Sequence, residues 1–394
     1  MLTADYKGKR ISMLDGWKRE QIMEMNEKES FSCPICKEAV VPKLGTKKMW
    51  HFAHRSTSQC LDSFEKESYY HLLGKKQLYR WLSNLGHDAI LEPFLPQSKQ
   101  RPDVMIRKDQ VAIEFQCATI TEDLFLQRTN GYKKEDIQVF WILGDKRVKR
   151  IGVNLFRISS YDLAMLMGHE RLVFFCPLSM VFRILSHIRP LSATKIYADE
   201  CLVPLKSMTL QSLTEDCTAE EHDEKFHQLW TAEKKKWRLQ SFQYHSPAYR
   251  YVKKIFSLHG HSLASFPSVC GVPSYGYYYI HTPAFLWQSW ISFYITSCSP
   301  FTEGQLSDAF LRLVNSRIFS IRAYPFLEGS YETALNHYLD YLLRKGILRE
   351  EDGFYTAVQA FRFHFSTLKA LEEDEKLRVH EANFSQIRSF SGKM

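Results

Sequence analysis

Cysteine and histidine residues in the first sixty positions have spacings that suit a metal ion. Cys33 and Cys36 are separated by two residues, so that both thiolates can reach one ion. His51, His54 and Cys60 can complete a tetrahedral site of sulfur and nitrogen ligands, the set that Zn²⁺ prefers. These are more ligands than one such site takes, so which histidine binds stays open. The alternatives are buried cysteines with surface histidines, or a redox pair, although no thioredoxin-like pattern surrounds it.

Two carboxylates further along the chain could hold a harder cation. Asp103 begins a short apolar segment, and Glu114 lies in the next one, after a tight turn at Lys108 and Asp109. A hairpin of these two strands would bring Asp103 close to Glu114, and paired carboxylates suit Mg²⁺ or a similar divalent ion. Such an ion supports phosphodiester hydrolysis by polarising the phosphate and activating water. Taken singly, Asp103 could cap a turn and Glu114 could face solvent.

A helix predicted over residues 64–85 precedes these strands. Glu67, His71 and Lys75 are spaced i, i+4, i+8 and therefore share one face of it. We expect Glu67 to supply a third carboxylate. The simpler interpretation of all three is that they are exposed or packing residues of an ordinary helix.

The elements that must position these residues alternate in type. Strands are predicted over 87–94, 101–107 and 110–118, a second helix over 123–134, and a buried apolar strand over 137–143. Residues 63–152 therefore have the element order α-β-β-β-α-β, and the fold class is α/β.

Within this order, Pro102-Asp103 followed by Glu114-x-Gln116 resembles the PD-(D/E)XK nuclease superfamily, a restriction-endonuclease-like fold. The resemblance implies a metal-dependent nuclease core, in which Gln116 stands in place of the motif lysine. Lysine carries a full charge for the transition state, whereas glutamine can only form hydrogen bonds. We therefore expect Gln116 to position water and Lys75 to be an auxiliary catalytic residue. A nuclease fold that has lost catalysis remains the alternative.

The same resemblance implies further site residues. Arg128 and Tyr132 are four apart on the second helix, as in the basic/Tyr motif with which several of these nucleases contact the scissile phosphate. His71 is a further catalytic candidate. An ordinary amphipathic helix is the competing interpretation for Arg128 and Tyr132.

Together, the Cys/His pattern, the Glu67/His71/Lys75 helix and the RPD…EFQ segment resemble the family of CoiA competence proteins, most specifically over residues 30–145. The family implies a cytoplasmic bacterial protein that acts on incoming DNA during natural transformation. It also implies work with the RecA recombinase on joint or branched DNA. Two alternatives stay open: a non-catalytic DNA-binding recombination accessory, and an adaptor for RecA that contacts DNA only incidentally.

Three segments are expected. Residues 1–62 form a zinc-finger-like domain, residues 63–152 the nuclease-like domain, and residues 160–394 a mostly helical C-terminal domain. Within the last, a helix is predicted over 178–188. Two helices and a hairpin over 303–358 favour a winged-helix-like unit for DNA or a protein partner, against a plain helical domain with one hairpin.

Composition agrees with a globular protein. The 394 residues include 52 Lys and Arg against 44 Asp and Glu, and 45% are apolar, which excludes disordered, collagen-like and coiled-coil proteins. The start lacks an apolar signal core and no apolar run is long enough to span a bilayer, so we expect a cytoplasmic protein. Nine cysteines argue against an extracellular disulfide framework. The net charge of +8 fits a nucleic-acid partner without establishing one.

Overall fold

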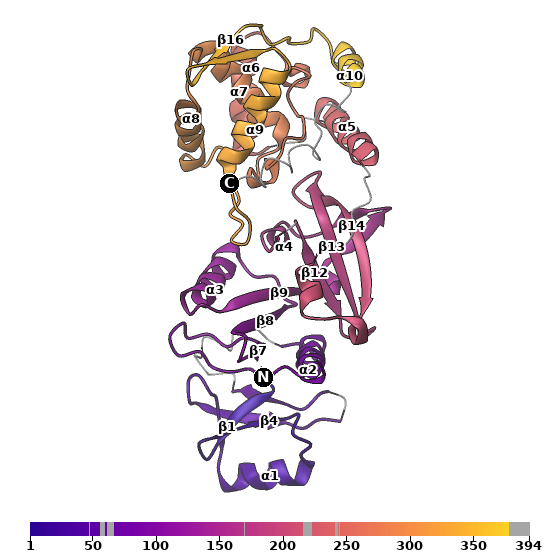
Figure 1. The fold of residues 1–394 in the computed structure, drawn as a ribbon, viewed down its shortest axis with the longest axis vertical. Coiled ribbons are helices and arrows are strands. Elements are labelled where there is room, and N and C mark those ends of the chain that lie inside the picture. Colours follow the sequence, from indigo (N-terminus) through magenta and orange to yellow (C-terminus); the bar gives the residue numbers. More distant parts are fainter. Residues whose placement is uncertain are drawn as a thin grey trace. The chain divides into compact units, whose positions relative to one another are not determined.

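The computed structural model describes residues 1–46, 48–55, 60, 67–168, 170–215, 223–240, 243 and 245–377. The chain forms two compact units (Figure 1). One comprises residues 1–188 and 198–219, and the other residues 189–197 and 220–394. Among the described residues, every helix is too short or too polar to cross a membrane.

The N-terminal part of the first unit is a small antiparallel sheet. Its strands are β1 (Thr3–Tyr6), β2 (Lys9–Ser12), β3 (Phe31–Ser32), β4 (Ala39–Lys43) and β5 (His51–His54), in the spatial order β2-β1-β3-β4-β5. Helix α1 (Arg19–Lys28) connects β2 to β3. The small core contains Ile22 and the rings of Phe31 and Phe52, whose centres lie 5.0 Å apart. Because this core is small, a bound metal ion would contribute substantially to the stability of the N-terminal sheet.

The predicted order of helix, three strands, helix and strand is present. Its elements are α2 (Tyr69–Asn84), β6 (Ala89–Leu91), β7 (Val104–Ile106), β8 (Val111–Gln116), α3 (Glu122–Lys134) and β9 (Gln138–Gly144). Strands β6, β7 and β8 pair antiparallel, so that β7 and β8 form the expected hairpin, and β9 pairs parallel with β8. A parallel pair needs a crossover, which α3 supplies.

Helix α2 is shorter than predicted. The hydroxyl of Ser68 accepts a hydrogen bond from the backbone N–H of His71 at 3.2 Å, and this N-cap starts the helix at Tyr69. Glu67 therefore lies just before the helix, not within it. Positions 64–66 of the predicted helix lie outside the described residues. The helix packs closely on β8, because Gly74 lacks the side chain that would collide with the ring of Phe115.

The large sheet continues well past residue 152. Five more strands join it: β10 (Lys149–Gly152), β11 (Leu155–Arg157), β12 (Leu172–Cys176), β13 (Val181–Pro190) and β14 (Lys195–Pro204). In the described residues the sheet has nine strands, ordered β10-β11-β14-β13-β12-β9-β8-β7-β6. The short helices η2 (Asp145–Arg147) and α4 (Ser160–Leu163) lie in its connections, and η3 (Leu205–Ser207) and η4 (Gln211–Leu213) follow β14.

The helix predicted over 178–188 is wrong, and so is the mostly helical character expected from residue 160 as far as Pro204. Phe182, Ile184 and Ile188 recur at even spacings and are all buried, which is the period of a strand. β13 also pairs with β12 along five residue pairs. Pairing with neighbouring strands therefore overrides the weak helical pattern.

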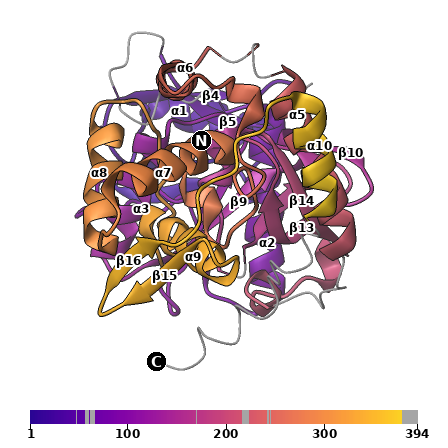
Figure 2. The same ribbon diagram turned by 90° about the horizontal axis from the view of Figure 1, so that it is seen from above.

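The second unit is mostly helical. Its helices are α5 (Asp223–Gln240), α6 (Pro247–Leu258), η6 (Leu263–Ser265), η7 (Tyr277–Tyr279), α7 (Ala284–Cys298), α8 (Glu303–Asn315), α9 (Tyr331–Arg344) and α10 (Thr367–Lys376). Strands β15 (Leu348–Glu351) and β16 (Phe354–Ala357) form one hairpin, and a bridge joins Phe301 to Tyr355. Helices α5 and α10 lie side by side (Figure 2). The predicted succession of two helices and a hairpin is present; its winged-helix interpretation stays a prediction.

Candidate functional site

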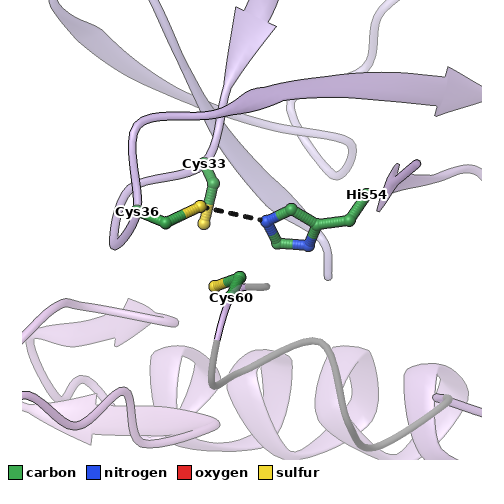
Figure 3. A group of neighbouring side chains, drawn as sticks. All are labelled: Cys33, Cys36, His54 and Cys60. Carbon is green, nitrogen blue, oxygen red and sulfur yellow. Dashed lines mark hydrogen bonds between the residues drawn. The ribbon is translucent and has the colours of Figure 1, made fainter. Parts of the chain in front are cut away.

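The structure brings three cysteines and one histidine together in the N-terminal sheet. Cys33, Cys36, His54 and Cys60 each offer one ligand atom, and these atoms all lie within 4.8 Å of one another (Figure 3). Cys33 follows β3, Cys36 lies in the next turn, and His54 ends β5. The Sγ atom of Cys36 lies 3.4 Å from Nε2 of His54. Three thiols and an imidazole are a common donor set for a structural zinc ion.

Of the two candidate histidines, only His54 lies in this group. His51 begins the same strand, but its Nδ1 lies 2.9 Å from the carbonyl oxygen of Met49. Burial raises the pKa of the Cys33 thiol, so that an isolated thiolate is disfavoured there. A bound cation would compensate that cost by stabilising the thiolates.

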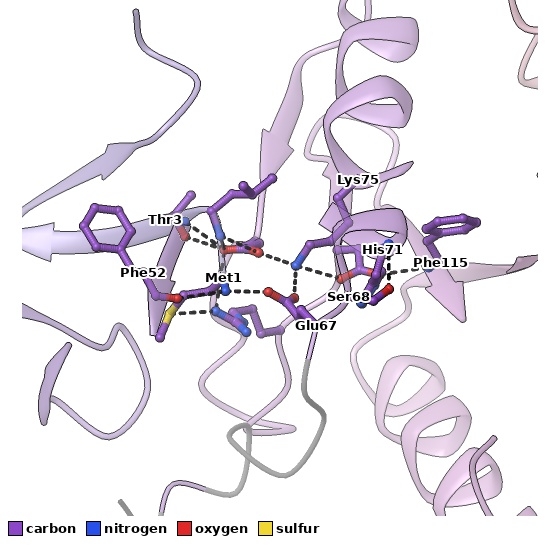
Figure 4. A network of polar contacts seen from close by, with 12 residues as sticks. Met1, Thr3, Phe52, Glu67, Ser68, His71, Lys75 and Phe115 are labelled. Atoms are coloured by element: carbon purple, nitrogen blue, oxygen red, sulfur yellow. Dashed lines mark hydrogen bonds and ion pairs between the residues drawn. The ribbon is translucent and has the colours of Figure 1, made fainter. Parts of the chain in front are cut away.

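A second group of ligand atoms lies where the beginning of α2 meets the beginning of β7. One ligand atom from each of Glu67, His71 and Asp103 lies within 4.8 Å of the others (Figure 4). Glu67 lies two residues before α2, His71 in its first turn, and Asp103 directly before β7. One carboxylate oxygen of Asp103 accepts a hydrogen bond from the backbone N–H of Phe115 at 2.9 Å and lies 3.1 Å from Nε2 of His71. Two carboxylates and one imidazole can hold a divalent ion.

Lys75 lies at the centre of these acidic residues. Its side chain is fully buried, and its ammonium group contacts the carboxylates of Glu67 and Glu92 and lies 3.4 Å from Oδ1 of Asp103. The interpretation of Lys75 as an exposed lysine is therefore wrong. Burial alone would lower the pKa of Lys75, but the carboxylates outweigh it and raise the pKa well above its ordinary value. Lys75 is thus a permanent positive charge.

The carboxylates respond in the opposite direction. Burial would raise the pKa of Asp103, but the charges of Lys75 and His71 hold it well below its usual range. For Glu92, burial is likewise outweighed, by Lys75 and then Arg101, and the pKa falls to about 2. Both acids are therefore ionised at neutral pH. Burial would lower the pKa of His71, yet the negative charge of Asp103 raises it.

Glu92 and Arg101 were missed at the sequence level. Glu92 is completely buried, and Arg101 lies 3.5 Å from its carboxylate. No motif marks Glu92, whose partners include backbone groups some ninety residues away. Arg101 directly precedes Pro102 and Asp103, so its position beside the RPD segment was the one available signal.

Glu114 lies in β8, and its side chain points toward α3. Its Oε1 accepts hydrogen bonds from Nη2 of Arg128, at 2.6 Å, and from the hydroxyl of Tyr132, both on α3. Glu114 is opposite Trp141 in the sheet, whereas Phe115 faces Gly74 on α2. The group of ligand atoms within 4.8 Å comprises Glu67, His71 and Asp103 and does not include Glu114, although the charge of Asp103 acts on Glu114. Burial raises its pKa to about 7 despite the attraction of Arg128.

The remaining predicted site residues are also engaged within the protein. The buried Gln116 donates a hydrogen bond from Nε2 to the carbonyl oxygen of Ala118 at 2.8 Å. Arg128 and Tyr132 share Glu114, as described above. Their predicted contacts with water and with phosphate stay predictions.

Comparisons with known proteins agree along the chain. The N-terminal domain of competence protein CoiA matches residues 14–63, its nuclease-like domain residues 67–218, and its C-terminal domain residues 226–371. The competence protein CoiA of Bacillus subtilis (strain 168) is 30% identical over 335 residues, which cover 82% of this chain and 88% of that protein. No solved structure gives a significant match. The chain therefore belongs to the CoiA family of competence proteins, and residues 67–218 are its nuclease-like domain.

Proposed function

We propose that this protein is a Mg²⁺- or Mn²⁺-dependent deoxyribonuclease that cuts incoming DNA during natural competence, in homologous recombination. The observation that supports this most is the convergence of Glu67, His71 and Asp103 within a nuclease-like domain. Joint or branched DNA, handled together with RecA, is the substrate that the family suggests. The core is assigned to the PD-(D/E)XK superfamily.

In this proposal, Glu67, Asp103 and the nearby Glu114 hold the divalent ion. The ion, when bound, would polarise the phosphate and activate a water molecule. His71 orients Asp103, and Lys75 provides the positive charge that Gln116 cannot supply. Gln116 positions water through its amide.

Arg128 and Tyr132 take the phosphate in the same proposal. Both now bind Glu114, whose raised pKa shows that burial disfavours its charge. A cation beside Glu114 would compete for its oxygen and leave the Arg128 and Tyr132 donors for a phosphate oxygen. Arg128 suits that role because a guanidinium matches phosphate geometry.

The Cys/His group is assigned a structural Zn²⁺ ion held by Cys33, Cys36, His54 and Cys60. All four positions are then protein ligands, which is the arrangement of structural and not of catalytic zinc. The ion would hold β3 and β5 together and stabilise the small N-terminal sheet.

A second candidate is a DNA-binding recombination accessory without catalysis. Lys75 favours it, because its ammonium contacts two carboxylates and lies near a third, and so supplies charge that a metal would otherwise bring. Such a protein binds DNA through Lys and Arg, and its affinity falls steeply with salt. A RecA adaptor, in contrast, would show affinity for DNA that is weak or insensitive to salt.

Cleavage of labelled single-stranded, duplex and branched DNA with Mg²⁺, Mn²⁺ or EDTA tests the proposal. Asp103→Asn and Glu67→Gln should each lower the cleavage rate roughly hundredfold or more, because each removes a charge that holds the ion. Asp109→Asn is the matched control, since Asp109 is an exposed carboxylate in the turn of the same hairpin. Salt-sensitive binding without cleavage by the unaltered protein would support the accessory instead.

A further inference from the structure

Glu92 is a buried acid that the proposed chemistry does not use. It follows β6, its side chain is completely inaccessible to solvent, and its backbone adopts the left-handed region, with φ at 49°. That conformation is uncommon outside glycine and persists only where surrounding contacts hold it. A buried charge likewise persists only where it is paired and hydrogen-bonded. Its partners therefore explain why it is there.

One set of partners belongs to the N-terminal strand. The Glu92 carboxylate accepts hydrogen bonds from the backbone N–H groups of Leu2 and Thr3 and from the hydroxyl of Thr3, each at 2.9 Å. Arg10 on β2 donates to the backbone oxygen of Glu92 at 3.2 Å. Glu92 thus binds the beginning of β1 directly to the nuclease-like domain.

The same strand is tied to the Cys/His group. The backbone N–H of Phe52 donates to the carbonyl oxygen of Met1 at 2.9 Å, and Phe52 lies in β5, which ends at the candidate ligand His54. In Figure 4, Thr3, Met1 and Phe52 lie on one side of the polar network, and Lys75 and His71 on the other. Glu92 contacts both sides, and so does Glu67, which pairs with the amino group of Met1 and with Lys75.

The second partner is Lys75. Its one ammonium group is shared by Glu67, Glu92 and Asp103, of which Glu67 and Asp103 are the proposed metal ligands. Glu92 and Glu67 contact the ammonium directly, whereas Asp103 lies 3.4 Å from it, so Glu92 competes with the two proposed ligands for the charge of Lys75. Without the Glu92 charge, Lys75 would pair with Glu67 and Asp103 alone and would compete with a divalent ion for their oxygens.

We propose that Glu92 is a positioning residue, which the N-terminal strand orients and which competes with Glu67 and Asp103 for the Lys75 ammonium, so that these two can bind a divalent ion. This inference rests on the proposed function. It makes the N-terminal domain a part of the nuclease-like site, because the amides of Leu2 and Thr3 fix the Glu92 carboxylate. Arg101, 3.5 Å from the same carboxylate, reinforces its charge.

Mn²⁺ binding to the full-length, zinc-loaded protein tests the inference, with calorimetry as the readout and Asp103→Asn to identify the site. Glu92→Gln keeps the shape of the side chain and removes its charge, and we expect it to weaken Mn²⁺ binding about tenfold or more. Adding Lys75→Met to this variant should restore most of the lost Mn²⁺ affinity, because the competing cation is gone. Thr3→Val, which removes one donor and leaves both amides, should change the affinity only about twofold.

Asp162→Asn is the matched control. Asp162 is another completely buried carboxylate of the same unit, paired with Arg147, and its loss should lower stability without changing Mn²⁺ affinity. Unchanged Mn²⁺ affinity in Glu92→Gln would overturn the inference. So would a loss that persists after Lys75→Met is added, since Glu92 would then be only structural. If the unaltered protein bound no Mn²⁺ at this site, the proposed function itself would fail, and the inference with it.

Discussion

Each unit of the protein buries a network of charged side chains, and the two networks are built differently. In the first unit, Glu67, Glu92 and Asp103 share Lys75, which we call the carboxylate network. In the second, Asp374 on α10 is shared by Lys234 and Arg238 on α5, which we call the Asp374 network. In the first network three acids surround one lysine, and in the second two cations share one acid.

The two networks also differ in the groups that surround their charged side chains. In the Asp374 network, Arg238 also donates to the carbonyl oxygens of Ala264 and Phe266, at 3.0 and 2.9 Å, and Lys234 to that of Ser268 at 2.5 Å. The backbone thus satisfies the extra donors. In the carboxylate network, Glu67 and Asp103 keep 13% and 12% of their side chains exposed. Carboxylates that solvent can reach are what a cation site requires, whereas a fully buried network only joins helices.

The largest effect should follow removal of the ion from the Cys/His group. This treatment should affect the carboxylate network and leave the other network unchanged. Structural zinc contributes on the order of 10–16 kcal/mol in zinc-finger peptides, so a strong chelator should unfold the N-terminal sheet and release β1 from Glu92. The Asp374 network should be unaffected. Hydrogen exchange measured along the chain would show both, and zinc released per chain would be counted in parallel. Equal protection of the N-terminal sheet with and without chelator would contradict the assignment.

The next largest effect concerns the Asp374 network. Asp374→Asn leaves Lys234 and Arg238 buried without an acid, and such broken pairs cost about 3–5 kcal/mol. Chemical unfolding followed by tryptophan fluorescence would measure it. DNA cleavage and Mn²⁺ binding under native conditions should be unchanged, because the network has no role in cation binding. A parallel loss of Mn²⁺ affinity would erase the distinction between the two networks.

Replacing Lys234 should change the stability in the opposite direction from replacing Asp374. Burial lowers the pKa of Lys234 to about 8 despite the nearby Asp374, so the charged form of Lys234 destabilises the folded state. Below about pH 8 both folded and unfolded chains carry this proton and the cost is complete; between there and the ordinary pKa of 10.5, only the unfolded chain keeps it, and the cost disappears. Lys234→Met should therefore stabilise the protein at pH 7 by at most roughly 3 kcal/mol.

That advantage should shrink as the pH rises from 8 to 10.5. Unfolding free energies of the variant and the unaltered protein, measured in pairs across this range, would show it. A variant that is less stable than the unaltered protein at pH 7 would mean that Lys234 stabilises the network.

The smallest effect tests how α2 is held over β8. A Cβ atom at Gly74 would lie 2.0 Å from the ring of Phe115, so Gly74→Ala must move the helix that carries His71 and Lys75. Overpacking of this kind costs about 1–3 kcal/mol, and Mn²⁺ affinity should fall with it. Gly168→Ala is the control in the same unit, because nothing lies within 4 Å of its added carbon. Equal stability of the two variants would show that α2 tolerates the shift.

The predictable parts of the site are those that short spacings define. Cys33 and Cys36, and the hairpin that bears Asp103, depend on contacts between near neighbours in sequence, and the structure contains both. Glu92 depends on backbone amides of Leu2 and Thr3, which carry no side-chain signature. The burial of Lys75 was equally hidden, because an isolated lysine on a helix is usually solvated.

The fold shows the same division. The order from α2 to β9 follows from local periodicity, and it was predicted. Strands β12 to β14 were not predicted, because their pairing partners decide their conformation more than their own pattern does. The pairing of Glu114 with Arg128 and Tyr132 was not predicted either, because it depends on how α3 packs against β8.

The most direct test of the account is the location of Mn²⁺ in crystals of the zinc-loaded protein, by anomalous scattering at wavelengths that separate manganese from zinc. The account predicts a manganese peak between Glu67, His71 and Asp103, lost in Asp103→Asn, and a zinc peak among Cys33, Cys36, His54 and Cys60. Crystals that bind manganese elsewhere, but that show only the ammonium group of Lys75 and no manganese beside Asp103, would contradict it.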